Sequence, residues 1–407
     1  GATPPVEMMR PYIAKEHTVT PSLTFTSILK NHTLLAGVQA YFTRLRETGL
    51  YVISAEDEKT SPYYGVPYTS IGKKHANEVG FFIQDEWNVT PKLTVVPGIR
   101  LDSHSSGEEY ATSVKVSDSA FPSTKFSKTT INPRLAVKYE VTPSLILRAN
   151  IGTGFRAPYG FSEDLHLCSG SPRVWKSSNL KGERAISYNL SADYYSKKYQ
   201  FSINLFRTNL KDKIQFSPAD DEVKKFGYSY QWENVDDAYV QGIELGAKAS
   251  IARNLTAGVN WTFNQGKFKH ERAEWSDPND ESVKEFPQRL KYAKESRYIS
   301  RFPGMTGDFD IDYTPGTWTF SLTGSLQGSM YIDYNSEDAG QNSKIKKTST
   351  FMLFNCRASK RFGMCTIYAG AKNIFSYIQD EKHTDDAAFM YAPVYGATWY
   401  VGLSVKL

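Results

Sequence analysis

Apolar and polar residues alternate along most of the chain with a period of two. The clearest example is segment 317–331, TWTFSLTGSLQGSMY, in which Trp318, Phe320 and Leu322 lie on one face and Thr, Ser and Gln residues on the other. This period is typical of a β-strand with one apolar face. Because the polar face carries hydroxyl and amide side chains rather than charge, it suits a wet barrel interior better than bulk solvent.

The same alternation predicts about fifteen strands. Most of them span about 12–15 residues, well above the roughly 5–6 residues typical of globular sheets. The predicted strands are 17–30, 32–46, 75–89, 92–104, 129–142, 144–156, 183–196, 199–213, 238–251, 254–267, 298–314, 317–332, 348–361, 363–374 and 395–407.

The connections between these strands alternate between short and long. Short turns are expected at Lys30-Asn31, Thr90-Pro91, Thr142-Pro143, Lys197-Lys198, Arg253-Asn254, Pro315-Gly316 and Gly363. Long polar loops are expected at 47–74, 105–128, 157–182, 214–237, 268–297, 333–347 and 375–394. Outer-membrane barrels show this alternation, with tight periplasmic turns and long outer loops. We therefore predict an all-β protein, a transmembrane antiparallel β-barrel of the bacterial outer membrane, with extracellular loops and periplasmic turns.

A short sequence recurs near three of these features. It reads VTPSL at 19–23, VTPKL at 89–93 and VTPSL at 141–145. The last two lie at predicted short turns, whereas the first lies inside the predicted strand 17–30. We interpret it as a partial echo rather than an internal repeat.

Composition and charge narrow the classes of function. The net charge is +5 over 407 residues, and no basic arm or stripe suggests nucleic acid as a partner. No apolar run approaches the ~18–20 residues of a transmembrane helix, which excludes a helical membrane protein. The three cysteines, Cys168, Cys356 and Cys365, form neither a CxxC zinc pattern nor a disulfide scaffold.

The predicted number of strands indicates an incomplete barrel. Single-chain bacterial barrels have an even number of strands. An open sheet edge in lipid would leave N–H and C=O groups unpaired. The chain also begins at Gly1, without the basic and apolar regions of a signal peptide. We therefore expect a processed or truncated start, with missing strands that precede Gly1 or come from another polypeptide.

Five motifs in order resemble those of TonB-dependent outer-membrane receptors. They are NPRLAVKY (132–139) followed by GTGFRAP (152–158), SSNLKGERAISYNLSADYY (177–195), ENVDDAYVQGIEL (233–245), AGAKNIF (369–375) and YGATWYVGLSVKL (395–407). The resemblance implies a barrel of 22 strands around an N-terminal plug. The fifteen strands would then be strands 8–22, so that residues 1–407 form the C-terminal portion of the barrel, with the plug and the first strands missing.

The resemblance also implies a function. Such a receptor imports a scarce metal chelate: haem, a ferric siderophore or cobalamin. Its loops and plug bind the cargo, the periplasmic TonB complex then remodels the plug, and no reaction is catalysed. No intrinsic cofactor is expected, and the partners would be TonB, outer-membrane lipid and the small cargo, with a surface lipoprotein as a further candidate.

Three other classes stay open at this point. A passive porin would have a permanently open lumen and no plug. A barrel enzyme such as an outer-membrane lipase would need a Ser/His pair at a lumen-facing rim, and no such spaced pair is visible in the sequence. A structural subunit of a larger outer-membrane assembly would account for the incomplete strand count.

The expected loop 157–182 carries the main candidate for cargo binding. In haem receptors of the family this loop supplies an axial histidine, and His166 lies eight residues after Pro158. Imidazole is a suitable axial ligand of haem iron. The alternative is that His166 is a solvated loop histidine. Cys168 is expected in a disulfide rather than as a catalytic thiol, and Arg156 is expected to pair with a carboxylate at the barrel rim.

Aromatic residues and an arginine provide further candidates. Tyr159, Arg173 and Trp175 could contact an anionic or planar ligand, because arginine pairs with carboxylates and aromatic rings stack. Membrane-interface packing or loop packing would explain them equally well. Tyr63, Tyr64 and Tyr68, in SPYYGVPY, could also contact cargo, or could belong to a loop shaped by Pro and Gly with interfacial tyrosines.

Overall fold

The computed structural model describes residues 12–51, 68–112, 123–159, 174–218, 221–224, 230–272, 296–299, 301–331, 348–379 and 391–406. They form eighteen strands and one short helix, α1 (Asp221–Lys224). The strands are β1 (Tyr12–Val19), β2 (Ser22–Leu29), β3 (His32–Tyr51), β4 (Tyr68–Thr90), β5 (Leu93–Thr112), β6 (Thr124–Thr142), β7 (Leu145–Arg156), β8 (Val174–Lys176), β9 (Glu183–Tyr195), β10 (Tyr199–Pro218), β11 (Tyr230–Ala252), β12 (Leu255–Arg272), β13 (Ser296–Tyr298), β14 (Met305–Tyr313), β15 (Trp318–Gln327), β16 (Phe351–Phe362), β17 (Cys365–Lys372) and β18 (Thr398–Val405).

The chain divides into two compact units. Unit 1 contains residues 1–136, 151–186 and 210–237, and unit 2 contains 137–150, 187–209 and 238–407. Strands β6, β7, β9, β10 and β11 contribute residues to both units. None of the described helices is long and apolar enough to cross a membrane.

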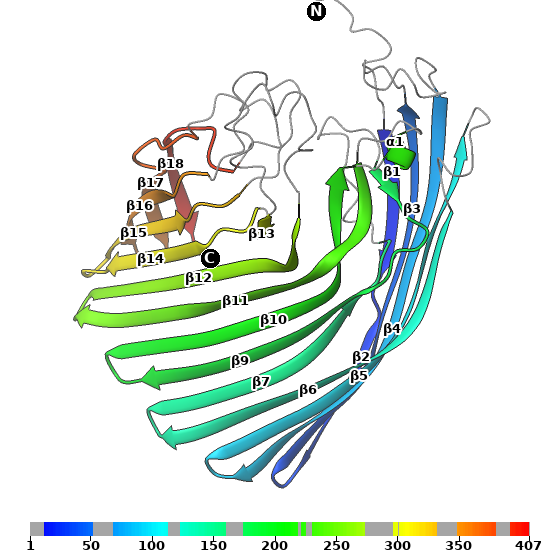
Figure 1. Cartoon of the computed structure of the whole chain (residues 1–407). Helices are drawn as coiled ribbons and strands as arrows, with labels where there is room; N and C mark the ends of the chain where they lie inside the picture. Colours follow the sequence, from blue (N-terminus) through cyan, green and yellow to red (C-terminus); the bar gives the residue numbers. More distant parts are fainter. Residues whose placement is uncertain are drawn as a thin grey trace, which may run out of the picture. The chain divides into compact units, whose positions relative to one another are not determined.

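In unit 1, β3 is paired on one side with β1 and β2, and on the other with β4, which in turn pairs with β5, all antiparallel. The β3–β4 ladder runs unbroken from His32↔Trp87 to Tyr51↔Tyr68. Figure 1 shows β3, β4 and β5 as long arrows side by side. The short β8 pairs in parallel with the start of β11, where Trp175 lies opposite Gln231.

In unit 2 the antiparallel pairing follows the chain. β11 pairs with β12, β12 with β14, and then β15, β16, β17 and β18 are added in order. A small apolar cluster of Met330, Phe351 and Tyr391 is buried in this unit. The buried core is small because most apolar side chains of the strands are exposed on one face of the sheet.

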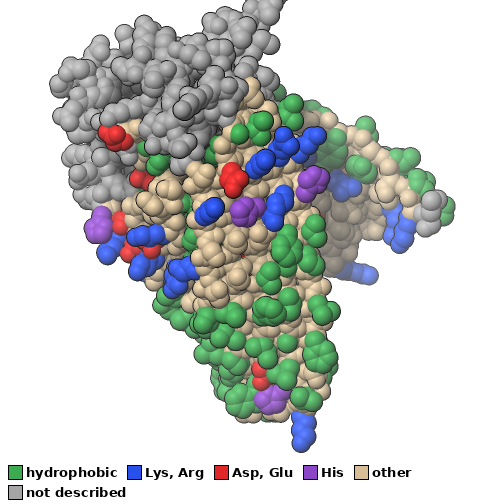
Figure 2. All heavy atoms as spheres, turned by 90° about the vertical axis from the view of Figure 1, so that its right-hand side faces the viewer, with side chains coloured by type: hydrophobic (Ala, Val, Ile, Leu, Met, Phe, Trp, Pro, Cys, Tyr) green, Lys and Arg blue, Asp and Glu red, His purple; other side chains and the backbone are tan. Residues whose placement is uncertain are grey.

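The two faces of the unit 1 sheet differ in chemistry. On β4 and β5, Phe81, Ile83, Ile99 and Leu101 are 55%, 52%, 48% and 43% exposed. They share one face, because Phe81 lies opposite Leu101 and Ile83 opposite Ile99. We call this the outer face. On β5 the intervening residues, such as Arg100 and Asp102, carry polar side chains on the opposite, inner face. Figure 2 shows hydrophobic side chains gathered over the lower part of the surface that it presents.

The predicted all-β fold is confirmed, and each predicted strand overlaps an observed one. The count differs, because predicted strand 17–30 corresponds to both β1 and β2, and because the described strands include the three-residue strands β8 and β13. Predicted strand 17–30 is interrupted at Thr20 and Pro21, between β1 and β2, although both pieces pair with β3. Proline has no N–H to donate to the ladder, which accounts for this break.

The long connections contain more strand than predicted. β3 continues to Tyr51, β4 begins at Tyr68, and β5 continues to Thr112, inside the ranges expected to be loops. In these extensions both faces carry polar residues, as in DSHSSGEEY at 102–110. The alternation of apolar and polar residues therefore stops before the strands end. For this reason, the strands predicted from that alternation are too short.

The recurring VTP sequence has two structural outcomes. At the β4–β5 turn, Thr90 Oγ1 accepts hydrogen bonds from the N–H groups of Lys92 and Leu93, at 3.2 and 3.0 Å. At the β6–β7 turn, Thr142 Oγ1 accepts the same pair of bonds from Ser144 and Leu145, at 3.2 and 3.0 Å. A threonine hydroxyl thus closes each tight turn. At 19–23 the chain remains extended because β3 pairs with both sides of the break.

Candidate functional site

The inner face of β5 carries a continuous series of polar side chains. They lie two residues apart and therefore point to the same side of the sheet. In order they are Arg100, Asp102, His104, Ser106 and Glu108. The last four are 3%, 4%, 4% and 1% exposed. Buried charge on this scale needs partners, and neighbouring strands supply them.

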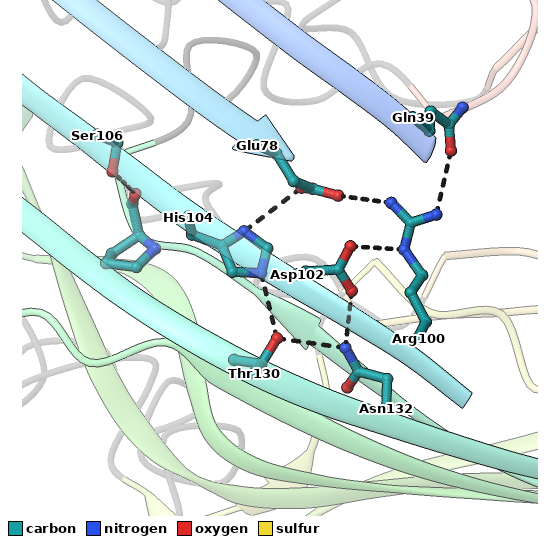
Figure 3. A network of polar contacts seen from close by, with 9 residues as sticks. Gln39, Glu78, Arg100, Asp102, His104, Ser106, Thr130 and Asn132 are labelled. Atoms are coloured by element: carbon teal, nitrogen blue, oxygen red, sulfur yellow. Dashed lines mark hydrogen bonds and ion pairs between the residues drawn. The ribbon is translucent and has the colours of Figure 1, made fainter. Parts of the chain in front are cut away.

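Arg100 is the centre of the first group of contacts (Figure 3). Its Nε donates to Asp102 Oδ1 at 2.5 Å, its Nη2 to Glu78 Oε1 at 3.3 Å, and its Nη1 to Gln39 Oε1 at 3.2 Å. Asn132 Nδ2 donates to the second oxygen of Asp102 at 3.0 Å. The guanidinium therefore links β3, β4 and β5, and the carboxylate of Asp102 extends the network to β6.

Gly80 makes room for this network. A Cβ atom at Gly80 would lie 2.2 Å from Arg100 Nη2 and 2.3 Å from Asp102 Oδ1. Both neighbours are held by other hydrogen bonds, so neither can easily move away. The glycine is therefore needed for close approach of the ion pair to the β4 backbone.

His104 links a carboxylate to a hydroxyl in the same network. Its Nδ1 lies 3.4 Å from Glu78 Oε2, and its Nε2 lies 3.3 Å from Thr130 Oγ1. This order is that of a hydrolase triad. However, Thr130 is 3% exposed, its hydroxyl also accepts a bond from Asn132 Nδ2 at 3.3 Å, and the ring packs against Phe155 with centroids 4.9 Å apart. Since no substrate atom could reach the covered hydroxyl, the arrangement is a structural one.

A second group of contacts holds the base of segment 157–182 against β5. Lys176 Nζ lies 2.7 Å from Glu108 Oε1, with side chains 7% and 0% exposed. Tyr110 Oη donates to the other carboxylate oxygen of Glu108 at 2.8 Å. At the start of the segment, Ser106 Oγ donates to the carbonyl of Pro158 at 3.1 Å. Both ends of the segment are therefore attached to one strand.

Tyr159 completes this base. Its side chain is 3% exposed and its hydroxyl donates to the carbonyl of Ser177 at 2.8 Å. Burial raises the pKa of Tyr159 to about 12, and the negative charge of Glu108 acts in the same direction, against a smaller opposite effect of a backbone hydrogen bond at Leu180. The phenol is therefore neutral at physiological pH and joins the two ends of the segment.

The structure places the predicted binding residues differently. Tyr159 lies in the packed base, which is the loop-packing alternative considered for it. Trp175 is partly exposed in β8, opposite Gln231. Tyr68 begins β4, where its backbone pairs with Tyr51. The other candidates, His166, Arg173, Tyr63 and Tyr64, lie outside the described residues, as does Cys168.

The prediction that Arg156 pairs with a carboxylate is confirmed, because its Nη1 lies 3.4 Å from Glu183 Oε2. Cys356 and Cys365 are both free thiols. The described part of the chain contains no group of three or more His, Cys, Asp or Glu side chains that could hold a metal ion.

Sequence reasoning missed the inner-face residues of β5. The sequence pattern predicts His104 at the end of strand 92–104 and Glu108 within loop 105–128. The signal that could have found them is the alternation of larger polar residues with Ser and Gly in 102–108, DSHSSGE. The partner of Glu108, Lys176, is 68 positions away and has no local sequence signal.

Comparison with known proteins shows that most of this chain is similar to one protein family. Residues 9–374 match the family model described as TonB dependent receptor-like, beta-barrel. The vitamin B12 transporter BtuB of Photobacterium profundum is 27% identical over 229 residues, covering 56% of this chain and 30% of that protein. The ferric enterobactin receptor of Pseudomonas aeruginosa is 26% identical over 202 residues, covering 45% of this chain and 24% of that protein.

Solved structures share the fold at low sequence identity. The copper transporter OprC has a TM-score of 0.69 and 18% identity, covering 97% of this chain and 57% of that one. The ferric citrate transporter FecA has a TM-score of 0.66 and 17% identity, covering 97% and 55%. The chain thus spans little more than half the length of these solved structures, and about a quarter to a third of the two curated relatives.

Proposed function

The chain belongs to the TonB-dependent receptor family of outer-membrane β-barrel proteins, and we propose that it is the barrel part of a receptor that imports a small metal chelate. The receptor would work with TonB, and the cargo would bind at the loop ends of the strands. In this proposal the chain provides the C-terminal portion of a longer barrel, and a plug domain completes the transporter.

The observation that supports the proposal is the two-faced wall of unit 1. Phe81 and Leu101 on the outer face are about half exposed, whereas Asp102 and His104 on the inner face are 3% and 4% exposed and hydrogen-bonded. An apolar exterior suits lipid, and a polar interior suits a barrel lumen. We propose that the network around Arg100 gives the lumen a fixed polar surface against which a plug can lie.

The attached base of segment 157–182 supports a binding role for the residues between its ends. The contacts Ser106–Pro158 and Glu108–Lys176 fix the two ends at β5. The candidate residues His166 and Arg173 lie between these ends in the sequence, and Trp175 lies beside the second. In this proposal, attachment of the two described ends limits the conformations open to the residues between them, which reduces the entropy lost when cargo binds.

For the cargo, we propose a ferric siderophore or cobalamin ahead of haem. The two curated relatives described above carry the names vitamin B12 transporter and ferric enterobactin receptor. Haem remains the case in which His166 would act as an axial ligand of the iron. Titration of the intact receptor and of His166→Ala with haem, followed at the Soret band, tests that case. Identical spectra and affinities would remove His166 as a ligand.

Uptake measurements test the proposal as a whole. The gene would be expressed in a strain that lacks its own chelate receptors, and uptake of labelled ferric enterobactin, cyanocobalamin and haem would be followed. We expect saturable uptake of one cargo class, which disappears when TonB is deleted. Uptake that persists without TonB and does not saturate would instead indicate a passive porin.

A further inference from the structure

Six basic residues form a compact grid on the outer face of unit 1. The register of β1, β3 and β4 places Lys15 opposite Arg46 and Arg46 opposite Lys73, and it places His17 opposite Arg44 and Arg44 opposite His75. We call these two sets of three the basic rows. Adjacent strands are about 4.8 Å apart and next-but-one residues about 6.6 Å apart, so all six lie within one small area.

The basic rows share a face with the apolar surface. Along β4, Lys73 and His75 lie eight and six positions before Phe81, and along β3 Arg44 lies two positions after Phe42, so each shares a face with that aromatic residue. Five of the six are exposed and His75 is partly exposed. Figure 2 shows Lys, Arg and His side chains grouped above the hydrophobic side chains on the surface that it presents.

The chain itself does little to neutralise this charge. None of the six forms an ion pair with a carboxylate among the described residues. Glu109 is the exposed carboxylate opposite Lys73 in the β4–β5 register. Arg44 Nη1 donates to Asn77 Oδ1 at 2.7 Å and to its neighbour's carbonyl, that of Thr43, at 2.9 Å. Four side chains with full positive charge therefore face outward beside one carboxylate.

An apolar groove lies further along the same strands. Its volume is about 580 Å³. The small side chain of Ala36 lies between Phe25 and Ile83 in the register, so the larger neighbours form its sides. The groove is lined by residues of β2 to β6, including Phe25, Val38, Phe81, Ile99 and Ile131. Arg44 and Val38 are six positions apart, which is about 20 Å along the strand. For a strand tilted by about 45° from the membrane normal, this length corresponds to ~14 Å of depth in the membrane.

These positions match the two ends of a membrane lipid. A charged residue on the lipid face costs about 2–4 kcal/mol at the bilayer midplane but little near the interface. The basic rows therefore belong at the level of the headgroups, and the groove ~14 Å deeper lies within one half of a ~30 Å hydrocarbon core. Arginine binds phosphate with two parallel hydrogen bonds, and lysine adds a point charge.

From this arrangement we propose that the basic rows and the groove bind one membrane lipid with more than one phosphate on its headgroup. The phosphates contact Arg44, Arg46 and Lys73, with Lys15 beside them, and an acyl chain occupies the groove. More than one phosphate is expected because four full positive charges stand in two rows. The inference rests on the proposed placement of this wall in a membrane, but not on the identity of the cargo.

A charge-removal variant with a matched control tests the site. The intact protein would be purified in a zwitterionic detergent, and bound lipid measured by native mass spectrometry during titration with three probes. The probes are lipid A, which carries two phosphates, phosphatidylglycerol and phosphatidylcholine. The test variant is Arg44→Gln/Arg46→Gln/Lys73→Gln. The control is Arg207→Gln/Lys267→Gln/Lys360→Gln in unit 2, where each cation lies over an aromatic ring.

We expect the wild type and the control to bind lipid A more tightly than phosphatidylglycerol. The test variant should bind lipid A about 100-fold more weakly, since each Lys or Arg near a membrane surface contributes about a factor of five. Phosphatidylcholine should bind equally to all three proteins. Equal affinity of the wild type and the test variant for lipid A would overturn the proposal.

Three further outcomes separate this inference from the proposed function. Competition by millimolar inorganic phosphate as effective as that by lipid A would overturn the lipid site, because it would show that the acyl chain contributes nothing. Failure of the wild type to bind any of the three lipids would contradict the membrane placement itself. If the test variant lost lipid A binding but kept TonB-dependent uptake, the result would support the lipid site and would show that uptake does not depend on it.

Discussion

Units 1 and 2 use the same strand ladders and both pair charged side chains with partners, but they differ in their outer-face cations. On the inner face of unit 1, cations and carboxylates are paired, as in Lys176–Glu108 at 2.7 Å and Lys74–Glu47 at 3.0 Å. In unit 2, the carboxylate of Asp308 accepts a hydrogen bond from Asn260 at 2.9 Å, and that of Asp312 accepts one from Ser321 at 2.5 Å. Ion pairs also occur in unit 2, between Arg148 and Asp193 and between Lys138 and Glu140, so its carboxylates have charged partners as well as amide and hydroxyl partners.

The outer faces of the two units differ in how their cations are arranged. In unit 2, Arg207 lies 4.4 Å from the ring centroid of Tyr239 and donates to Gln241 at 2.7 Å, and Lys267 lies 5.1 Å from the ring centroid of Tyr298. Each of these cations lies against an aromatic ring of the same chain. In unit 1 the basic rows stand together with one exposed carboxylate beside them. We conclude that the charged residues of the inner face stabilise the fold, whereas the basic rows are suited to binding a partner from outside the chain.

The largest expected effect comes from breaking a buried ion pair of unit 1. Glu108→Gln removes the charge that faces Lys176 Nζ, and loss of one partner of a buried pair costs about 3–5 kcal/mol. Denaturant unfolding in detergent measures the change in the free energy of unfolding. The matched control is Glu109→Gln, the exposed neighbour on the outer face, for which a change below about 0.5 kcal/mol is expected. Similar losses for both variants would contradict the distinction between the faces.

An intermediate effect is expected for the inner-face glycines. At Gly80 an added Cβ would meet Arg100 and Asp102 within 2.3 Å, so Gly80→Ala should cost about 1–3 kcal/mol in the free energy of unfolding. At Gly258 in unit 2, the Cβ would meet one side chain, that of Asp310, at 2.5 Å. That side chain can rotate away, and Gly258→Ala should cost less. Thermal unfolding of the two variants side by side decides this, and a larger loss at Gly258 would reverse the order.

The packed base of segment 157–182 should show a pH dependence. The pKa of Tyr159 is raised from 10.0 to about 12, so the folded state holds this proton more tightly than the unfolded state does. The stabilisation is fully present below pH 10 and is lost as the pH rises through about 12. Unfolding curves between these values should therefore show a loss of stability that is smaller in Tyr159→Phe. Tyr313→Phe, in unit 2, leaves Tyr159 in place and should keep the full loss.

The smallest effect concerns the outer-face cations. Arg207→Gln removes a hydrogen bond and a contact over Tyr239, which should cost about 0.5–1 kcal/mol in the free energy of unfolding. Arg46→Gln removes no ion pair with a described carboxylate and should change stability by less than about 0.5 kcal/mol in lipid-free detergent. If Arg46→Gln proved the more destabilising of the two, the basic rows would have a structural role instead.

Much of the wall could be predicted from the sequence. Period-two alternation located a strand for each of the fifteen predictions, and turn residues such as Thr90-Pro91 and Thr142-Pro143 located the short connections. The prediction failed where both faces become polar. There β3, β4 and β5 continue as strands because their neighbours supply backbone hydrogen bonds, a condition that side-chain alternation does not record.

By itself, the sequence determined the all-β architecture, the tight turns and the family resemblance, because these depend on local periodicity and on short motifs. Only the tertiary structure decided which polar residues meet. Glu108 and Lys176 pair across 68 positions, and Lys15, Arg46 and Lys73 form a row only once three strands are in register. The physical reason is that register is set by the whole ladder of backbone hydrogen bonds, so a charge acquires its partner, or remains open to an outside one, only when the strands are aligned.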